Sequence, residues 1–254
     1  MATSISLRRH QFLHVEVRHV PALQSIEWLR RGWDDLSHSR AASLTQGAMI
    51  AILGAVLLIL FSTHAYLFAA AVTGYLLVGP IMTTELCELS RRREMAQPGA
   101  GEQPATRDAR SLFRFGAILG SLALLWFIAS ATMLQTVLHA STPSLGVELW
   151  GGFTDAITRP QLLAYIASGA VLAGIVFCLS VVAVPLIIDR HASATDAMWT
   201  SLRVTFANLP AMLVWAALIV AVTALGFITL LFGMIVVAPL LGHATWHAYR
   251  DLVR

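Results

Sequence analysis

The basic residues of this chain are confined to a few short stretches, and long uncharged apolar runs separate those stretches. All seventeen are arginines, and sixteen of them fall within residues 8–40, 91–114, 190–203 and 250–254, which leaves only Arg159 outside. Moving arginine through hydrocarbon costs about 2.5–3.5 kcal/mol per residue on insertion scales, so short basic loops stay on the cytoplasmic side of a membrane. The pattern predicts a polytopic membrane protein with both chain ends in the cytoplasm.

The lengths of the apolar runs fit six membrane-spanning helices, because a helix needs about 20 residues to cross a core about 30 Å thick. Residues 41–84 carry no charge, and Ser62-Thr63-His64 interrupts them, which predicts two spans. Residues 115–139 and 161–188 predict one span each, and the uncharged run between Arg203 and Arg250 predicts two, with a break near Gly226. The expected fold class is all-α, a membrane bundle of six transmembrane helices arranged as three hairpins.

This topology divides the chain into two parts. Residues 1–40 form a cytoplasmic N-terminal tail with an interfacial helix, and residues 41–254 form the six-span membrane domain. Within that domain we expect cytoplasmic loops at 85–114 and 189–207 and an outer loop at 140–160.

The composition agrees with the membrane class. Hydrophobic residues make up 57% of the chain and charged residues 12%, against about 45–50% and 25% in soluble domains.

Two glycines of the first expected span, Gly47 and Gly54, lack side chains that would keep a neighbouring helix away. We expect a close helix contact there.

An internal repeat is visible in the expected spans. The second, fourth and sixth expected spans each contain a similar short apolar sequence around one proline. The dipeptide Ser-Leu precedes the first, third and fifth spans. The three prolines are Pro80, Pro185 and Pro239. We interpret the pattern as one helical hairpin used three times, each copy led by an amphipathic segment that lies flat on the membrane surface. The alternative is that Ser-Leu and a single proline are common in membrane helices.

The repeated prolines also select candidate site residues. Residues four positions apart share a helix face, and counting four and eight residues beyond each proline gives six polar side chains that would surround the inner mouth of the bundle. They are Thr84, Glu88, Asp189, Ser193, His243 and His247.

Two of these six are candidate metal ligands with a suitable spacing. His243 and His247 stand four residues apart, the spacing by which one helix offers two imidazoles to a metal, and a third ligand would have to come from Asp189 or Glu88. The alternative is that these histidines, with Trp246 and Tyr249, form an interfacial anchor that needs no ligand.

The sequence favours a protein without catalysis. No nucleophile with a base, phosphate-binding glycine loop or pair of carboxylates within a span is found. We therefore predict no enzyme, no cofactor and no nucleic-acid partner. We expect a scaffold or accessory membrane subunit whose partners are the lipid bilayer and other membrane proteins. The alternative is a carrier or channel for a small neutral or weakly polar solute, with the proline bends as a gate.

Four strings of residues resemble a known family. They are Trp28-Leu-x-x-Gly32-Trp33-x-Asp35-Leu, Glu88-Leu-Ser90-Arg91-Arg, Pro185-Leu-x-x-Asp189-Arg190 and Gly242-His243-Ala-Thr-Trp246-His247-Ala-Tyr249-Arg250-Asp251-Leu-Val. Together they resemble the bacterial family of predicted integral membrane proteins known as domain of unknown function 2189, over about Val20 to the C-terminus. The resemblance implies a bacterial cytoplasmic (inner) membrane protein and carries over no catalytic residue.

Overall fold

The computed structural model describes residues 15–61, 65–96, 109–137 and 159–254, and the structural statements below concern these residues. Within them the secondary structure is helical, apart from an isolated antiparallel bridge between Val17 and Val253. The all-α fold class is therefore confirmed for the described chain. Most of the expected outer loop and part of the expected cytoplasmic loop 85–114 lie outside the described residues.

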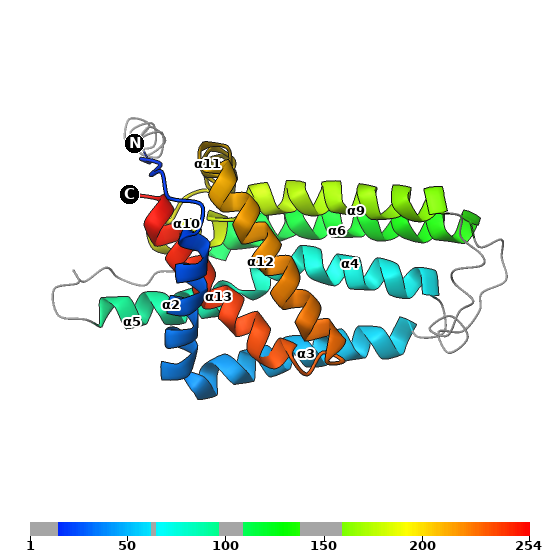
Figure 1. Cartoon of the computed structure of the whole chain (residues 1–254), viewed down its shortest axis with the longest axis horizontal. Helices are drawn as coiled ribbons and strands as arrows, with labels where there is room; N and C mark the ends of the chain where they lie inside the picture. Colours follow the sequence, from blue (N-terminus) through cyan, green and yellow to red (C-terminus); the bar gives the residue numbers. More distant parts are fainter. Residues whose placement is uncertain (1–14, 62–64, 97–108, 138–158) are drawn as a thin grey trace.

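Four long helices lie side by side as rods (Figure 1). They are α3 (Arg40–Phe61), α4 (Ala65–Met82), α6 (Ala109–Val137) and α9 (Arg159–Ser180). The other helices are α2 (Gln24–His38), α5 (Thr84–Met95), α10 (Ala183–Arg190), α11 (Ala194–Ala207), α12 (Leu209–Ile228) and α13 (Met234–Leu252).

The count of six spans is not confirmed. In the described residues, four segments are long and apolar enough to cross a membrane: α3, residues 109–133 of α6, residues 159–190, and α12. The last apolar run breaks slightly later than expected, because α12 continues past Gly226 to Ile228 and a turn at residues 229–233 follows.

Several helices gather at one end of the rods, which we call the basic end. It holds α2, α5, α10, α11 and the C-terminal part of α13 (Figure 1). These elements carry many of the arginines: Arg30, Arg31, Arg91, Arg92, Arg93, Arg190, Arg203 and Arg250. The opposite end is where α3 and α6 finish and where α4 and α9 begin. Arginines from separate stretches of the sequence thus lie together at one end of the structure.

Two helices at the basic end run across the rods (Figure 1). One side of α2 is buried, including Trp28 and Leu36, whereas Leu23, Ile26 and Trp33 are exposed. Helix α11 is partly exposed in the same way through Trp199 and Phe206. Amphipathic helices with exposed tryptophans suit the membrane surface, so both match the amphipathic segments expected before the first and third hairpins. The second expected segment, Thr106 to Arg110, begins outside the described residues.

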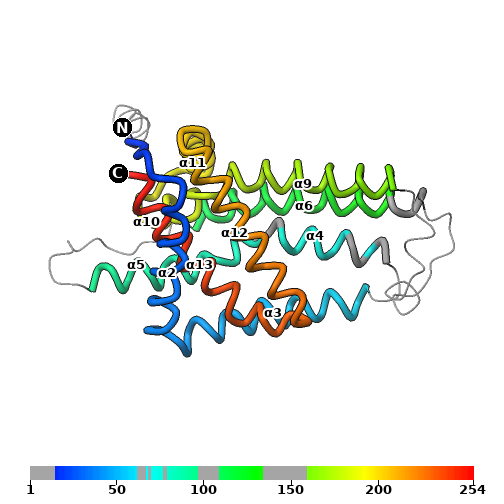
Figure 2. Tube along the Cα trace, viewed as in Figure 1, coloured from blue at the N-terminus to red at the C-terminus, as the bar shows by residue number. Residues whose placement is uncertain are grey.

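The last two helices form an oblique hairpin, visible in the chain trace of Figure 2. A Cβ atom added to Gly47 of α3 would lie 2.0 Å from the carbonyl oxygen of Ile235, and one added to Gly54 would lie 3.1 Å from Leu231. The expected close contact at these two glycines is confirmed, and its partners are α13 for Gly47 and the turn before α13 for Gly54.

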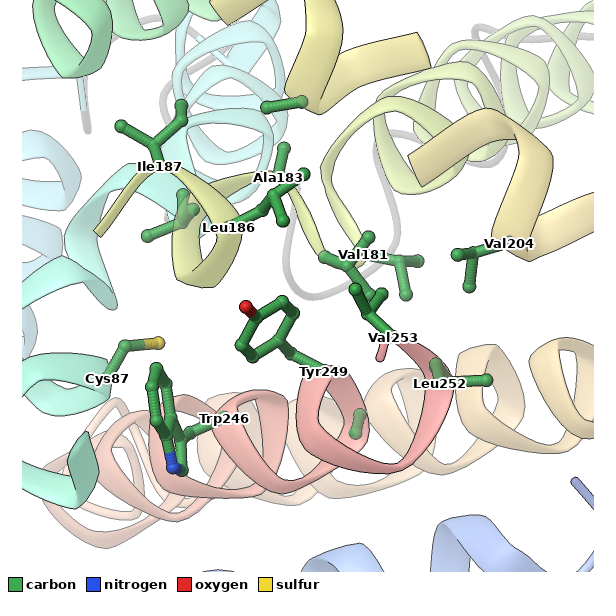
Figure 3. Close-up of a cluster of buried hydrophobic side chains, with 14 of the residues drawn as sticks. Cys87, Val181, Ala183, Leu186, Ile187, Val204, Trp246, Tyr249, Leu252 and Val253 are labelled. Carbon is green, nitrogen blue, oxygen red and sulfur yellow. The ribbon is translucent and has the colours of Figure 1, made fainter. Parts of the chain in front are cut away.

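The largest buried cluster lies at the basic end. Side chains from α5, α10, α11 and α13 meet there, among them the labelled Ile187, Trp246 and Tyr249 (Figure 3). The helix is interrupted at Val181 and Val182 between α9 and α10, just before Pro185, which removes one helical hydrogen bond. A second, smaller cluster joins α3, α4 and α13 through Ile50, Tyr75 and Met234.

Candidate functional site: a polar joint at the basic end

The second half of α13 is polar, and its side chains reach several different helices. His243 contacts α3 and α5, Trp246 contacts α5, His247 contacts α2, Tyr249 contacts α10, and Asp251 contacts α2. Each contact is a side-chain hydrogen bond across at least 60 residues of sequence. We call this set of interactions the polar joint.

A hydrogen-bonded chain of four side chains forms its centre. Ser90 Oγ of α5 lies 2.5 Å from Asp35 Oδ2 of α2 and 2.7 Å from Nδ1 of His243. The other ring nitrogen of His243, Nε2, lies 2.9 Å from Ser43 Oγ at the start of α3. Asp35 is 6% exposed, Ser90 2%, and Ser43 and His243 0%. One buried chain therefore joins four helices.

The ionisation of Asp35 sets the direction of every hydrogen bond in this chain. Burial raises the pKa of Asp35, but hydrogen bonds from His247 and Ser90 and the charges of His247 and Arg93 outweigh burial and hold the pKa below 3.8. A carboxylate only accepts, so Ser90 donates to Asp35 and accepts from Nδ1–H of His243. The Nε2 atom of His243 then accepts from Ser43.

His243 is neutral in this arrangement. It lies between α3 and α5, at the basic end and beyond the apolar half of α13. Burial lowers the pKa of His243 to about 4, against the opposing effect of the Asp35 charge. A neutral imidazole offers one donor and one acceptor, and both are used here. The chain is thus completely satisfied at neutral pH.

Asp35 also pairs with two basic groups. Arg93 of α5 bonds to Oδ1, and Nε2 of His247 lies 3.0 Å from Oδ2. The neighbouring Asp34 is exposed. Because it gathers partners from α5 and α13, Asp35 is the carboxylate on which the joint centres.

A second carboxylate fastens the C-terminal end of α13 to α2. Asp251 accepts from Nε1 of Trp28 at 2.8 Å, from Nε2 of Gln24 at 2.9 Å and from the Arg31 guanidinium. Burial raises the pKa of Asp251, but these hydrogen bonds outweigh it and lower the pKa below 3.8. The Trp28 ring also meets Trp215 of α12 edge to face at 5.7 Å. The interfacial helix is therefore attached to the hairpin by polar and aromatic contacts together.

A third group of contacts connects α13 with α5 and α10. Glu94 of α5 accepts from Nε1 of Trp246 at 2.9 Å and pairs with Arg250 at 2.7 Å. Tyr249 donates to Asp189 of α10 at 2.6 Å. All three contacts come from Trp246, Tyr249 and Arg250 of one helix, so α13 is the element around which the basic end is organised.

The six side chains selected by the proline offset do not form one cluster. His243 and His247 lie at the centre of the joint, near Asp35. Asp189 bonds to Tyr249 on the α10 side of the joint, and Glu88 pairs with its own neighbours Arg91 and Arg92, at 3.0 and 2.9 Å. Thr84 bonds to the carbonyl of Ile81, and Ser193 caps α11.

The four metal candidates are accordingly divided among three places. Among the described residues, no group of three or more His, Cys, Asp or Glu side chains is placed to hold a metal ion.

The interpretation of the closing motif as a lipid-facing anchor is wrong. His243, Trp246 and Tyr249 are at most 1% exposed, and their polar atoms reach other helices rather than headgroups. An aromatic residue at the end of an apolar run has the same sequence pattern whether it faces lipid or protein, which is why the sequence did not separate the two.

Sequence reasoning also missed three members of the central hydrogen-bonded chain: Asp35, Ser90 and Ser43. A signal was present, because Asp35 and Ser90 each fall inside a string that carries the family resemblance, and Ser43 belongs to the repeated Ser-Leu. Nothing in the sequence pairs them, however, since 200 residues separate Ser43 from His243.

A solvent-open pocket of about 330 Å³ lies beside the joint. Asp35, Ser90 and His247 contribute to its wall. The remaining lining residues are Arg31, Asp34, Arg93, Glu94 and Arg250, so the three arginines and three carboxylates of the wall balance in charge. Each arginine is paired with a carboxylate of this chain: Arg31 with Asp251, Arg93 with Asp35, and Arg250 with Glu94. The arginines of the pocket are thus engaged in ion pairs within the protein.

Comparison with known proteins places the chain in the membrane class. Residues 67–189 match the model of a family described as "Predicted integral membrane protein (DUF2189)". The chain is similar to this family over 123 of its 254 residues. The match to DUF2189 begins inside α4 and ends at Asp189 of α10, so it is shorter than the extent expected from Val20 to the C-terminus, and α2 and α13 lie outside it. No curated protein and no solved structure matches the chain.

Proposed function

We propose that this integral membrane protein is a non-enzymatic scaffold or accessory subunit. The observation that carries the proposal is the internal use of its polar groups: the buried carboxylates, imidazoles and hydroxyls of the joint bond to one another and hold α2, α3, α5, α10 and α13 together. Such an arrangement stabilises a defined surface at the basic end, which a partner subunit could use.

The joint contains two serines and two histidines, and its geometry argues against hydrolytic chemistry. Ser43 donates to a neutral imidazole, as an attacking serine would, but neither Ser43 nor His243 has any exposed surface. Ser90 lines the pocket, yet its hydroxyl proton is held by Asp35 at 2.5 Å. A substrate has no path to the first serine, and the second is engaged with a carboxylate.

The proposed location is the bacterial cytoplasmic membrane, with the basic end and both chain ends in the cytoplasm. The gathering of arginines at one end supports this orientation, because arginine near a span is retained inside. Two exposed arginines make a matched pair of reporters: Arg203 lies at the basic end and Arg159 begins α9 at the opposite end.

Cysteine substitution at these two positions tests the orientation. In a variant lacking Cys87 and Cys178, a membrane-impermeant maleimide applied to intact cells should label Arg159→Cys, whereas Arg203→Cys should react only after the cells are opened. The reverse pattern would contradict the proposed orientation.

Purification in a mild detergent tests the scaffold role. We expect the full chain to retain a partner protein in fixed stoichiometry, and we expect Asp35→Asn to lose that partner while Asp34→Asn keeps it, because only Asp35 supports the joint. Solute flux in liposomes containing the purified protein alone, with no retained partner, would instead favour the carrier or channel.

A further inference from the structure

The α12–α13 hairpin does not extend as far as the rods beside it. The rod α3 serves as a ruler, because it runs from Ser43 in the polar joint to Phe61 at the opposite end. Leu231 in the turn of the hairpin packs on Gly54. Seven residues of α3 continue beyond Gly54, which is about 10 Å at 1.5 Å per residue.

The neighbouring rod α4 also places the turn of the hairpin well short of the opposite end. Tyr75 lies 3.5 Å from the Cβ position of Gly54 and belongs to the buried cluster that contains Leu231. Since α4 begins at Ala65, ten residues, or about 15 Å, separate this level from the opposite end of the rod. The turn therefore lies among the middle parts of α3 and α4.

Helix α13 is too short in its apolar part to cross a membrane. It begins at Met234, and by His243 it has reached the polar joint. Nine residues cover about 14 Å of helix, less than half of a hydrocarbon core about 30 Å thick. Helix α12 is longer, but it runs obliquely to the rods (Figures 1 and 2).

The turn itself suits an environment without water. The side chains of Ile228, Leu230 and Phe232 are 76%, 78% and 74% exposed, and all are apolar. Backbone N–H groups of Leu230, Phe232 and Met234 donate to carbonyls of the same segment, and that of Gly233 donates to Thr229 Oγ1 at 2.7 Å. Backbone groups in hydrocarbon need such internal partners.

We propose that α12–α13 is a re-entrant hairpin, which enters the bilayer from the basic end, turns inside the hydrocarbon and returns to the same end. The exposed face of its turn contacts lipid acyl chains. The four rods then cross the membrane: α3, α6, α9 and also α4, which has 18 residues. Helix α12 turns back inside the bilayer although it is long and apolar enough to cross, and the return of α13 brings its polar half back to the joint. This assignment does not depend on which side of the membrane the basic end occupies.

Spin labels at Leu230→Cys and Phe232→Cys in the cysteine-free background test the proposal in liposomes. We expect high collision rates with dissolved oxygen and low rates with a polar nickel complex, in contrast to nickel-accessible labels at Arg159→Cys and Arg203→Cys. Nickel access at the turn comparable with that at Arg159→Cys would show a water-exposed outer loop and overturn the re-entrant path. Low access to both reagents would show that protein covers the turn and would overturn lipid as its neighbour.

An impermeant maleimide gives an independent check on the same variants. Cysteines in hydrocarbon stay protonated and do not react, so Leu230→Cys should be unlabelled from either side and fully labelled after denaturation. Labelling from the side that labels Arg159→Cys would contradict the proposal. A reversed pattern at Arg159→Cys and Arg203→Cys alone would overturn only the orientation proposed above.

Discussion

The rods and the basic end of this molecule are held by different interactions. In the apolar window of α6 only 17% of the residues are buried in the protein, and apolar side chains such as Leu124, Leu125 and Ile128 are exposed. At the basic end, several carboxylates, two histidines and several hydroxyls are buried or half-buried and paired. Lipid solvates apolar side chains as well as another helix does, so the rods gain little from contact. The comparison teaches that the specific arrangement of helices is set where polar partners meet.

The most damaging single change should be the removal of the central carboxylate. Asp35→Asn leaves the Arg93 guanidinium and the His247 ring without their negative partner, and breaking a buried ion pair from one side costs about 3–5 kcal/mol. The adjacent Asp34→Asn, at an exposed carboxylate, should change the free energy of unfolding by about 0.5 kcal/mol or less. Denaturation in mixed micelles measures both. Equal effects would show that the joint does not distinguish the two positions.

Acid should weaken the basic end through His243. Its pKa is about 4 in the folded protein and 6.5 as its ordinary value, so below pH 6.5 the unfolded chain binds a proton that the folded chain does not. Stability should fall by about 1.4 kcal/mol per pH unit as pH drops from 6.5 toward 4. The ionised Asp35 carboxylate also stabilises the folded protein. That stabilisation is lost on acidification as well, but only at a lower pH, because the pKa of Asp35 lies below 3.8.

Two substitutions separate this effect from general acid sensitivity. His243→Gln should remove most of the slope of the unfolding free energy between pH 6.5 and 4. His38→Gln, at an exposed histidine on α2, should leave the slope intact. A slope that survives His243→Gln would assign the acid sensitivity to other groups.

The contact between α3 and α13 inside the membrane part should be sensitive to a single methyl group. Gly47→Ala places a Cβ atom where the backbone oxygen of Ile235 lies, and overpacking of this kind costs about 1–3 kcal/mol. Gly120→Ala is the matched control on α6, because nothing lies within 4 Å of its Cβ position. Thermal unfolding in detergent should show a lower midpoint for the first variant only. A neutral Gly47→Ala would mean that the two helices are farther apart than described.

The smallest expected effect concerns the far end of the hydrogen-bonded chain. Ser43→Ala removes the donor to Nε2 of His243, and the loss of one such bond costs about 1 kcal/mol. Ser121→Ala is a fair comparison, because Ser121 is exposed and bonds only to the carbonyl of Ala117 in its own helix. Chemical denaturation of both variants checks the difference. A loss from Ser121→Ala as large as that from Ser43→Ala would remove the distinction between rod and joint.

Much of the rod architecture could be predicted from the sequence. Uncharged runs of the right length, interrupted by Ser62-Thr63-His64, correctly place α3 and α4 as separate helices. A helix is also expected within residues 1–40, and α2 lies there with Trp33 exposed. These features depend on local composition, which a single sequence records directly.

The joint could be predicted only in part, for a physical reason. The closing motif marked the right helix, but the partners of His243 come from α3 and α5 and are 200 and 153 residues away. A hydropathy profile also records which residues are apolar but not how deep they lie in the membrane. It therefore could not show that α13 reaches polar partners after nine residues.

A double-mutant cycle between Asp35 and His247 measures the polar joint most directly. We expect Asp35→Asn and His247→Gln to be coupled by about 1 kcal/mol or more in the free energy of unfolding, because the two side chains bond across α2 and α13 at 3.0 Å. The control cycle pairs His247→Gln with Asp34→Asn and should be additive. If the Asp35 cycle is additive as well, within about 0.5 kcal/mol, these side chains do not join the interfacial helix to α13.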